Sequence, residues 1–241
     1  EVADLSEIEI TEDEVDTVVT PTIPDFVHQT YFQEATGATA EVNLSGVTLP
    51  NIDAGVNSVA SGEAVSESGG FTEFYVTQGL AANPVASGDM LEVLLPDTQF
   101  ATPLEDDFTG FIYSDGTNFW PGYVFAIDAD VTDKAGMKEV FNADFESSNS
   151  LTNLFLNDPG TPSADGFKDG TAIAGGGNAR WVSFSTEGAS INYGWKGDFL
   201  VVSTSFNGFK AAVANLGTAT APVKPAAEEE TVEEEVTPEE A

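Results

Sequence analysis

The residues with the clearest spacing for chemistry are carboxylates in the segment DADVTDKAGMKE. Oxygen-bearing side chains stand at its first, third, fifth and twelfth places, as in a calcium-binding loop: Asp128, Asp130, Thr132 and Glu139. Such a loop turns sharply at a glycine in its sixth place, where this chain has Asp133. The segment also matches a strand end followed by a helix with Thr132 as N-cap. Calcium ligation by Asp128, Asp130 and Glu139 is one interpretation, and a capped helix is the other.

Two further segments offer charged groups without a recognised motif. The acidic loop NDPGTPSADGFKDG contains three candidate cation ligands, Asp158, Asp165 and Asp169. The following GGGNAR lacks the Lys-Ser/Thr of a phosphate-binding loop and precedes a strand, so it is interpreted as a turn. Arg180, the only arginine, is expected to pair with one of the many carboxylates.

Nucleophilic and metal chemistry have few residues to use in this chain. The absence of cysteine excludes disulfides, thiolate catalysis and cysteine-ligated metals. His28 is the only histidine, so a histidine-ligated zinc site has no second ligand of this type. No G-x-S-x-G motif occurs that would mark a serine nucleophile. A glycosidase-like carboxylate pair stays open, but nothing selects two of the 41 acids. The sequence predicts no enzyme, and no cofactor apart from the calcium interpretation.

The charge balance restricts the partners of the chain. It has 41 acidic and seven basic residues, for a formal net charge of −34. Phosphate backbones and anionic lipids would repel such a chain, so we expect no nucleic-acid partner. Solubility at high concentration, a salty habitat and loose collection of cations are three interpretations of the acidic excess.

Both ends of the sequence are typical of acidic tails. Residues 1–25 carry nine acids and no base, and 218–241 are rich in Pro, Ala and Glu. Neither buries enough apolar surface to offset the entropy of ordering, so we expect a tether, one domain over 26–217 and a disordered tail. A short acidic helix at an interface is the alternative for the tail.

No apolar run reaches the length of a membrane helix, about 18–20 residues. The missing initiator methionine is consistent with a removed signal peptide or N-terminal membrane anchor.

Hydrophobic periodicity predicts regular elements mainly in residues 71–217. Strands are predicted over 71–79, 108–114, 119–131, 179–185, 189–195 and 198–205, and helices over 87–96, 133–145 and 206–217. Hairpin turns are expected at Asp115-Gly116 and across 196–198. The Ser/Gly/Ala-rich segment 51–70 is either a loop or a weak helix.

The order strand, turn, strand, link and helix occurs at 108–143 and again at 189–216. It predicts an α+β domain: an antiparallel sheet with helices packed on one face, built from two related ββα units. The period of the last helix puts four apolar residues on one face: Phe206, Phe209, Val213 and Leu216. Other aromatic residues form either a binding platform or part of the core: Trp120, Trp181, Trp195 and Tyr193.

Residues 71–217 resemble exported, membrane-anchored domains of unknown function from ultra-small candidate-phyla bacteria. The segments that carry the resemblance are FTGFIYSDGTNFWPGYVFAIDADV, LTNLFLNDPG, FKDGTAIAGGGNARWVSFS and ASINYGWKGDFLVVSTSFNGFKAAV. The matching residues are Phe167, Asp169, Arg180, Ser190, Ile191, Tyr193, Leu200, Thr204 and Ser205. The chain departs from the pattern in its scarcity of lysine and in its segment 51–70. The resemblance implies an extracytoplasmic location, at the cell surface or secreted, and implies no activity.

The chain has a tether, one domain and a tail, and it has no catalytic motif. This layout favours a non-catalytic exported or cell-surface protein that acts in interaction, adhesion or envelope scaffolding. Its protein or surface partner is unknown. A self-assembling subunit of a surface layer or filament is an alternative, suggested by the acidic, cysteine-free composition. A hydrolase with a carboxylate pair is another alternative.

Overall fold

The computed structural model describes residues 28–33, 39–62, 68–98, 100, 103–173 and 177–216. The tails expected over 1–25 and 218–241 lie outside the described residues. The strands are β1 (Ala40–Leu44), β2 (Phe71–Gln78), β3 (Asn83–Pro84), β4 (Leu104–Ser114), β5 (Phe119–Ile127), β6 (Lys168–Ala172), β7 (Asn178–Ser183), β8 (Ser190–Lys196) and β9 (Phe199–Ser203). The helices are α1 (Leu49–Ala60), α2 (Ser87–Leu94), α3 (Lys134–Ser147), the 3₁₀ turn η2 (Leu151–Leu154) and α4 (Phe206–Asn215).

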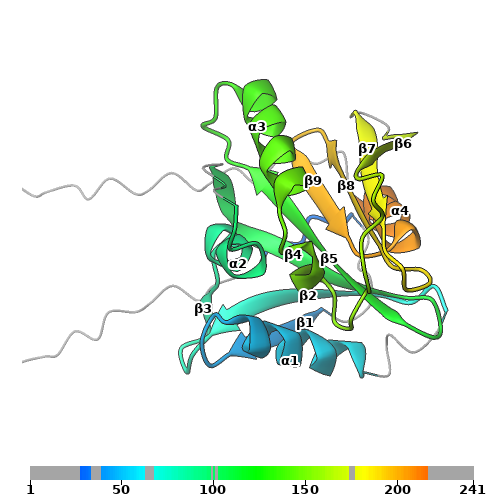
Figure 1. The fold of residues 1–241 in the computed structure, drawn as a ribbon. Coiled ribbons are helices and arrows are strands. Elements are labelled where there is room, and N and C mark those ends of the chain that lie inside the picture. Colours follow the sequence, from blue (N-terminus) through cyan, green and yellow to red (C-terminus); the bar gives the residue numbers. More distant parts are fainter. Residues whose placement is uncertain are drawn as a thin grey trace, which may run out of the picture.

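All nine strands belong to one twisted sheet in the centre of the molecule (Figure 1). Their order is β1-β2-β4-β5-β9-β8-β7-β6, and the short β3 pairs with β2. The β1–β2 pair is parallel, whereas the other neighbouring strands run antiparallel. The α+β class is confirmed, with a mixed sheet in which β1 departs from the antiparallel pattern.

Two hairpins, β4–β5 and β8–β9, form the middle of the sheet because β5 pairs with β9. The first turn has Gly116 at φ 89°, a left-handed conformation that favours glycine. Asp115 Oδ1 accepts hydrogen bonds from the backbone N–H groups of Thr117 at 2.8 Å and Asn118 at 2.7 Å. The second turn has Gly197 at φ 59°. Both predicted hairpins are confirmed.

The segment 51–70 begins with a helix, because 51–60 belong to α1. Its buried residues, Ile52, Val56 and Ala60, recur every four positions and form one narrow face. A Cβ atom on Gly55 would lie 2.4 Å from Val42 Cγ1, so glycine allows α1 to approach β1 closely. Small residues here are therefore a feature of packing, and the helix interpretation is confirmed for this part.

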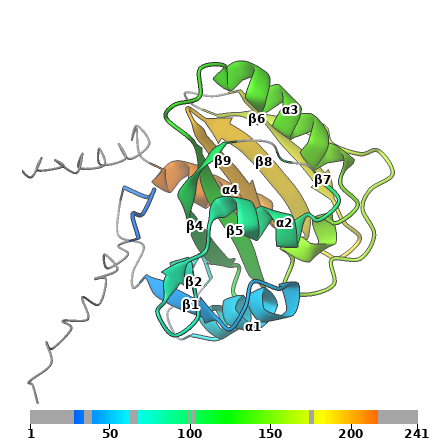
Figure 2. The ribbon, with the colours of Figure 1, turned by 90° about the vertical axis from the view of Figure 1, so that its left-hand side faces the viewer.

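Helices cover both faces of the sheet. The first three, α1, α2 and α3, share a large core on one face, which Figure 2 turns toward the viewer. In contrast, α4 packs on the opposite face over a smaller cluster that includes Phe111, Val124, Val201 and Phe209. The sequence predicted that all helices pack on one face of the sheet. This holds for α1, α2 and α3, but α4 packs on the other face. A Cβ on Gly208 would lie 2.7 Å from Ser203 Oγ, so small residues let α4 approach the sheet.

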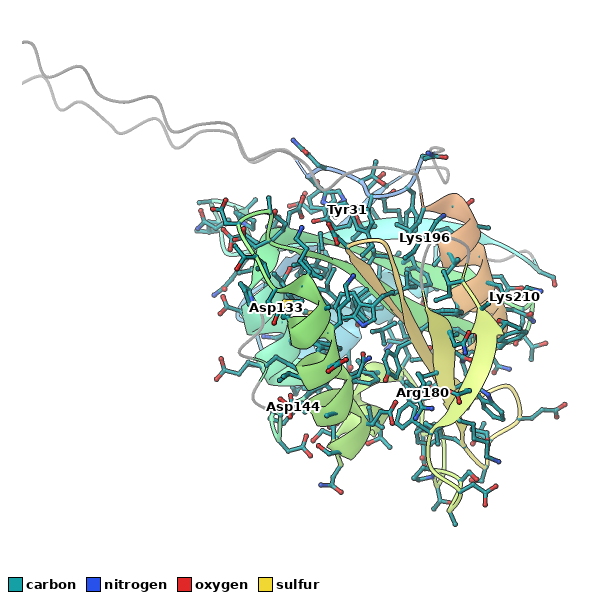
Figure 3. All side chains as sticks on the ribbon, turned by 90° about the horizontal axis from the view of Figure 1, so that it is seen from above. Tyr31, Asp133, Asp144, Arg180, Lys196 and Lys210 are labelled. Carbon is teal, nitrogen blue, oxygen red and sulfur yellow. The ribbon has the colours of Figure 1, made fainter. Side chains whose placement is uncertain are left out.

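The two predicted ββα units, β4–β5–α3 and β8–β9–α4, keep the same order of elements along the chain. They differ in packing, because the sheet lies between α3 and α4 (Figure 3). The two units therefore share the hairpin followed by a helix, but their helices pack on opposite faces of the sheet. Within the described ranges, no helix combines the length and the apolar character needed to cross a membrane.

Candidate functional site

A groove of about 640 Å³ lies on the α4 side of the sheet, over β6, β7 and β8. Helix α4 packs mainly against β8, β9, β4 and β5, and of β7 it covers the end at Ala179, which is buried with Phe209. The lining comes from β6, β7 and β8, the β7–β8 loop and the start of α4: Gly170, Thr171, Trp181, Ser183–Ser190, Asn192 and Phe206. Its volume falls within the range of about 300–1,000 Å³ that is usual for small-molecule sites.

Strand register places the floor of the groove. Trp181 on β7 is paired with Asn192 on β8, and Ser183 is paired with Ser190. Because side chains alternate along a strand, these four residues face α4, while Arg180 and Tyr193 face α3. One pair of strands thus presents a different set of side chains on each face.

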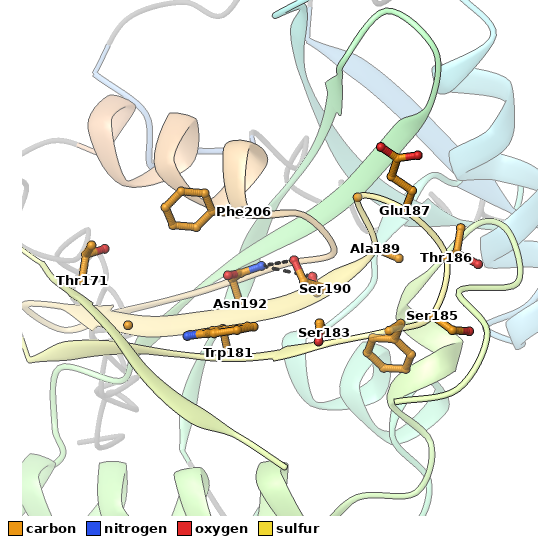
Figure 4. A pocket seen from close by; sticks show the side chains of 13 residues that line it. Thr171, Trp181, Ser183, Ser185, Thr186, Glu187, Ala189, Ser190, Asn192 and Phe206 are labelled. Carbon is orange, nitrogen blue, oxygen red and sulfur yellow. Dashed lines mark hydrogen bonds between the residues drawn. The ribbon is translucent and has the colours of Figure 1, made fainter. Parts of the chain in front are cut away.

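Asn192 is the buried polar residue of this floor, with 3% of its surface exposed. Its Nδ2 group donates to the carbonyl oxygen of Ser190 at 3.1 Å and to Ser190 Oγ at 2.7 Å (Figure 4). No group in the described ranges donates a hydrogen bond to the Asn192 side-chain oxygen. A buried acceptor needs a donor, and at this position a water molecule or a ligand group in the groove can supply it.

Two aromatic side chains flank this floor, with Phe206 on one side of Asn192 and Trp181 on the other (Figure 4). Trp181 is half-buried, and Phe206 is 46% exposed. Of the apolar residues that the helical period puts on one face, Phe209 and Leu216 are buried, whereas Phe206 is not. As the first residue of α4, Phe206 reaches the groove instead of the core.

The opposite face of β7 carries a closed charge network around Arg180 (Figure 3, where Arg180 is labelled). Its guanidinium donates to both oxygens of Glu146 on α3, at 2.7 and 2.8 Å, and to Asp169 Oδ1 at 2.9 Å. The Tyr193 hydroxyl donates to Glu146 Oε1 at 2.6 Å. Burial alone would raise the pKa of Glu146, but the Arg180 and Tyr193 hydrogen bonds lower it overall. The expected pairing of Arg180 with carboxylates is confirmed.

His28 lies in a second closed cluster, which holds the segment 28–33 against the sheet. Its Nδ1 is 3.0 Å from Asp107 Oδ1, and its Nε2 is 3.0 Å from Glu73 Oε1. Burial would lower the pKa of His28, but the two carboxylates outweigh it and raise the pKa to about 9. Both ring nitrogens of the imidazolium therefore donate to carboxylates, which leaves no basic nitrogen for catalysis.

The first acidic loop adopts the capped-helix arrangement. Asp133 is the N-cap of α3, one residue after the predicted Thr132, and accepts from the Gly136 backbone N–H at 3.0 Å. Asp128 Oδ1 accepts from the backbone N–H of Asp130 at 2.8 Å, while Glu139 lies within α3. The described residues contain no group of three or more His, Cys, Asp or Glu side chains placed to hold a metal ion.

The second acidic loop separates its three carboxylates among different partners. Asp158 Oδ1 accepts from the Gly160 backbone N–H at 2.8 Å. Asp165 pairs with Lys168 at 2.6 Å, and Asp169 pairs with Arg180. These contacts order the loop and the β6 edge.

The predicted aromatic platform divides between core and surface. Trp120, Trp195 and Tyr193 are buried, whereas Trp181 lies on the groove. Sequence reasoning did not select Asn192, Ser190, Ser183 or Phe206 as site residues. The available signal was the alternation of RWVS and SINY, which places Trp181 and Asn192 on one face of adjacent strands.

No family model, curated protein or solved structure matches this chain. The chemistry of the groove is therefore the basis for a functional proposal.

Proposed function

We propose that this chain is a non-catalytic interaction domain of an exported or cell-surface protein, and that it binds its ligand in the groove between Trp181 and Phe206. The observation that carries the proposal is the buried Asn192 side-chain oxygen, which has no donor among the described residues, on the floor of a groove with two accessible aromatic rings. Aromatic surface with a few fixed polar groups is the usual composition of a binding site.

The distribution of charge supports binding rather than catalysis. The groove lining contains one acid, Glu187, and no basic residue. A glycosidase-type reaction needs two carboxyl groups on either side of the bond to be broken, so this lining does not favour the hydrolase alternative. Among the described clusters, Arg180 and His28 are each held by carboxylates in structural contacts.

Indole NMR tests this proposal on the full chain. The three tryptophans should yield three indole N–H signals, of which Trp181 alone lines the groove. We would add a panel of small neutral probes, consisting of sugars, capped dipeptides and substituted benzenes. A shift of the Trp181 signal with at least one probe class is the expected result. No shift with any class, or shifts centred on another surface, would contradict the proposal.

A further inference from the structure

We propose that the ligand of the groove is a neutral glycan, bound with one sugar ring against Trp181 and with a hydroxyl group donating to the Asn192 side-chain oxygen. This inference rests on the proposed function and adds the chemical class of the ligand. It follows from the aromatic rings, the hydroxyl-rich lining and the charges around the groove.

The aromatic rings match the apolar side of a sugar. A pyranose ring carries C–H groups on its faces and hydroxyl groups around its edge. Its C–H face removes apolar surface from water when it packs on an indole or phenyl ring. Trp181 and Phe206 offer two such rings on either side of Asn192 (Figure 4).

The polar lining matches the hydroxyl groups of a sugar. The Asn192 oxygen is a buried acceptor with no donor among the described residues, and a sugar hydroxyl supplies one. Around it lie the hydroxyl groups of Thr171, Ser183 and Ser190, each of which donates and accepts. A ligand with several hydroxyl groups can therefore exchange its bonds to water for bonds to this lining.

The groove has charges of both signs around it, so neither an anion nor a cation meets charges of opposite sign alone. The net charge of −34 and Glu187 in the lining repel anions. Cations meet a local obstacle, because each ring of the groove already has an ammonium group nearby. Lys168 Nζ is 5.7 Å from the centre of the Trp181 ring, and Lys210 Nζ is 5.5 Å from that of Phe206. Both ammonium groups repel a cationic ligand that approaches these rings.

The position on the sheet disfavours an extended peptide. A peptide that adds to a sheet uses free backbone groups along an edge strand. The floor of this groove is formed by β7 and β8, which are each paired on both sides, whereas the edge strand β6 contributes only Gly170 and Thr171 to the lining. Recognition on this floor therefore depends on side-chain hydroxyl, amide and aromatic groups.

Calorimetric titration of the full chain tests the inference. The probes are neutral oligosaccharides of glucose, galactose, mannose and N-acetylglucosamine in α and β linkages, with uronic acid oligomers and capped peptides for comparison. We expect at least one neutral oligosaccharide to bind and the uronic acid oligomers not to bind. Trp181→Ala and Phe206→Ala should each weaken that binding by about tenfold or more, since each removes a stacking surface.

A matched control is Leu80→Ala, which also removes an exposed large side chain but lies away from the groove. Its affinity should equal that of the unmodified chain, and circular dichroism should show that all three variants fold. Asn192→Leu adds a second test: it should lose affinity for the oligosaccharide because it removes the acceptor.

The outcomes separate this inference from the proposed function. Binding of peptides or substituted benzenes at Trp181, without binding of any neutral oligosaccharide, would overturn the glycan inference and leave the groove as a binding site. Oligosaccharide binding that both aromatic variants retain would also overturn it. If no probe of any class shifts the Trp181 indole signal, the proposed function fails as well.

Discussion

The two faces of strands β7 and β8 use polar side chains in different ways. On the α3 face, Arg180, Glu146 and Tyr193 satisfy one another with short hydrogen bonds. On the α4 face, in the next pair of the register, the Asn192 side-chain oxygen has no donor in the described part of the chain and lies beside two accessible aromatic rings. A closed network stabilises a fold, whereas an acceptor that faces a groove is available to a donor from outside the protein.

This comparison also separates the two best-paired cationic residues from the proposed binding groove. The two cationic side chains with the most complete carboxylate contacts, His28 and Arg180, lie outside the groove lining. Substitutions in the closed clusters should therefore affect stability, and substitutions in the groove should affect binding. Each of the following predictions tests one side of that separation.

The largest expected effect is the pH dependence of the His28 cluster. The pKa of His28 is raised from 6.5 to about 9, so its ion pairs stabilise the folded state fully below pH 6.5. This contribution should be lost as the pH rises from 6.5 through about 9, by about 3 kcal/mol in total. Urea unfolding of the unmodified chain and of His28→Gln across this pH range measures it. The difference between the two should shrink as the pH rises, and a constant difference would contradict this role of His28.

The next effect concerns the closed network on the α3 face. Glu146→Ala leaves Arg180 and the Tyr193 hydroxyl without their shared acceptor and should lower the free energy of unfolding by about 2 kcal/mol. Asp169→Ala is the matched control. Its carboxylate is 73% exposed, so its pair with Arg180 should contribute less than about 0.5 kcal/mol. Equal losses of stability in the two variants would show that Glu146 is not the centre of this network.

A smaller stability effect is expected on the α4 face. Trp181→Ala removes a half-buried ring from the groove, and the free energy of unfolding should fall by less than about 1 kcal/mol. Thermal melting and urea unfolding measure this change. A loss as large as that of Glu146→Ala would assign Trp181 to the core and weaken the separation between the two faces.

The smallest effect is expected in the first acidic loop. Asp128→Asn keeps the oxygen that accepts the backbone N–H of Asp130, so the melting temperature should not change. Millimolar calcium should leave the melting temperature of both chains unchanged, because the described carboxylates form no metal-binding group. Light scattering with and without calcium completes the test. Assembly or a rise in melting temperature on adding calcium would favour the surface-layer alternative.

Local sequence signals predicted the second half of the fold well, for identifiable reasons. The turns at Gly116 and Gly197 need left-handed glycine, and the strands around them alternate or are continuously apolar. Helix α4 begins at an N-cap serine, Ser205, whose side chain accepts from the Gly208 backbone N–H. Such features depend on nearest neighbours, which a sequence shows directly.

Long-range features were not predictable in the same way. The parallel pairing of β1 with β2 joins segments about 30 residues apart, and α1 depends on the contact of Gly55 with Val42. The side on which α4 packs depends on small residues from three elements, including Gly194, Ser203 and Gly208. For the same reason the groove was missed, because its floor exists only when β7 and β8 pair in register.

The measurement that tests the central claim most directly is the indole NMR spectrum of the full chain during titration with the neutral oligosaccharides. Trp120 Nε1 donates to Asp115 at 2.8 Å and Trp195 Nε1 donates to Asn142 at 3.0 Å, so these two indole N–H groups already have acceptors within the protein. We predict that the Trp181 signal shifts with saturation while the signals of Trp120 and Trp195 stay in place. An unchanged Trp181 signal with every oligosaccharide, or equal shifts of all three signals, would contradict a glycan site in the groove.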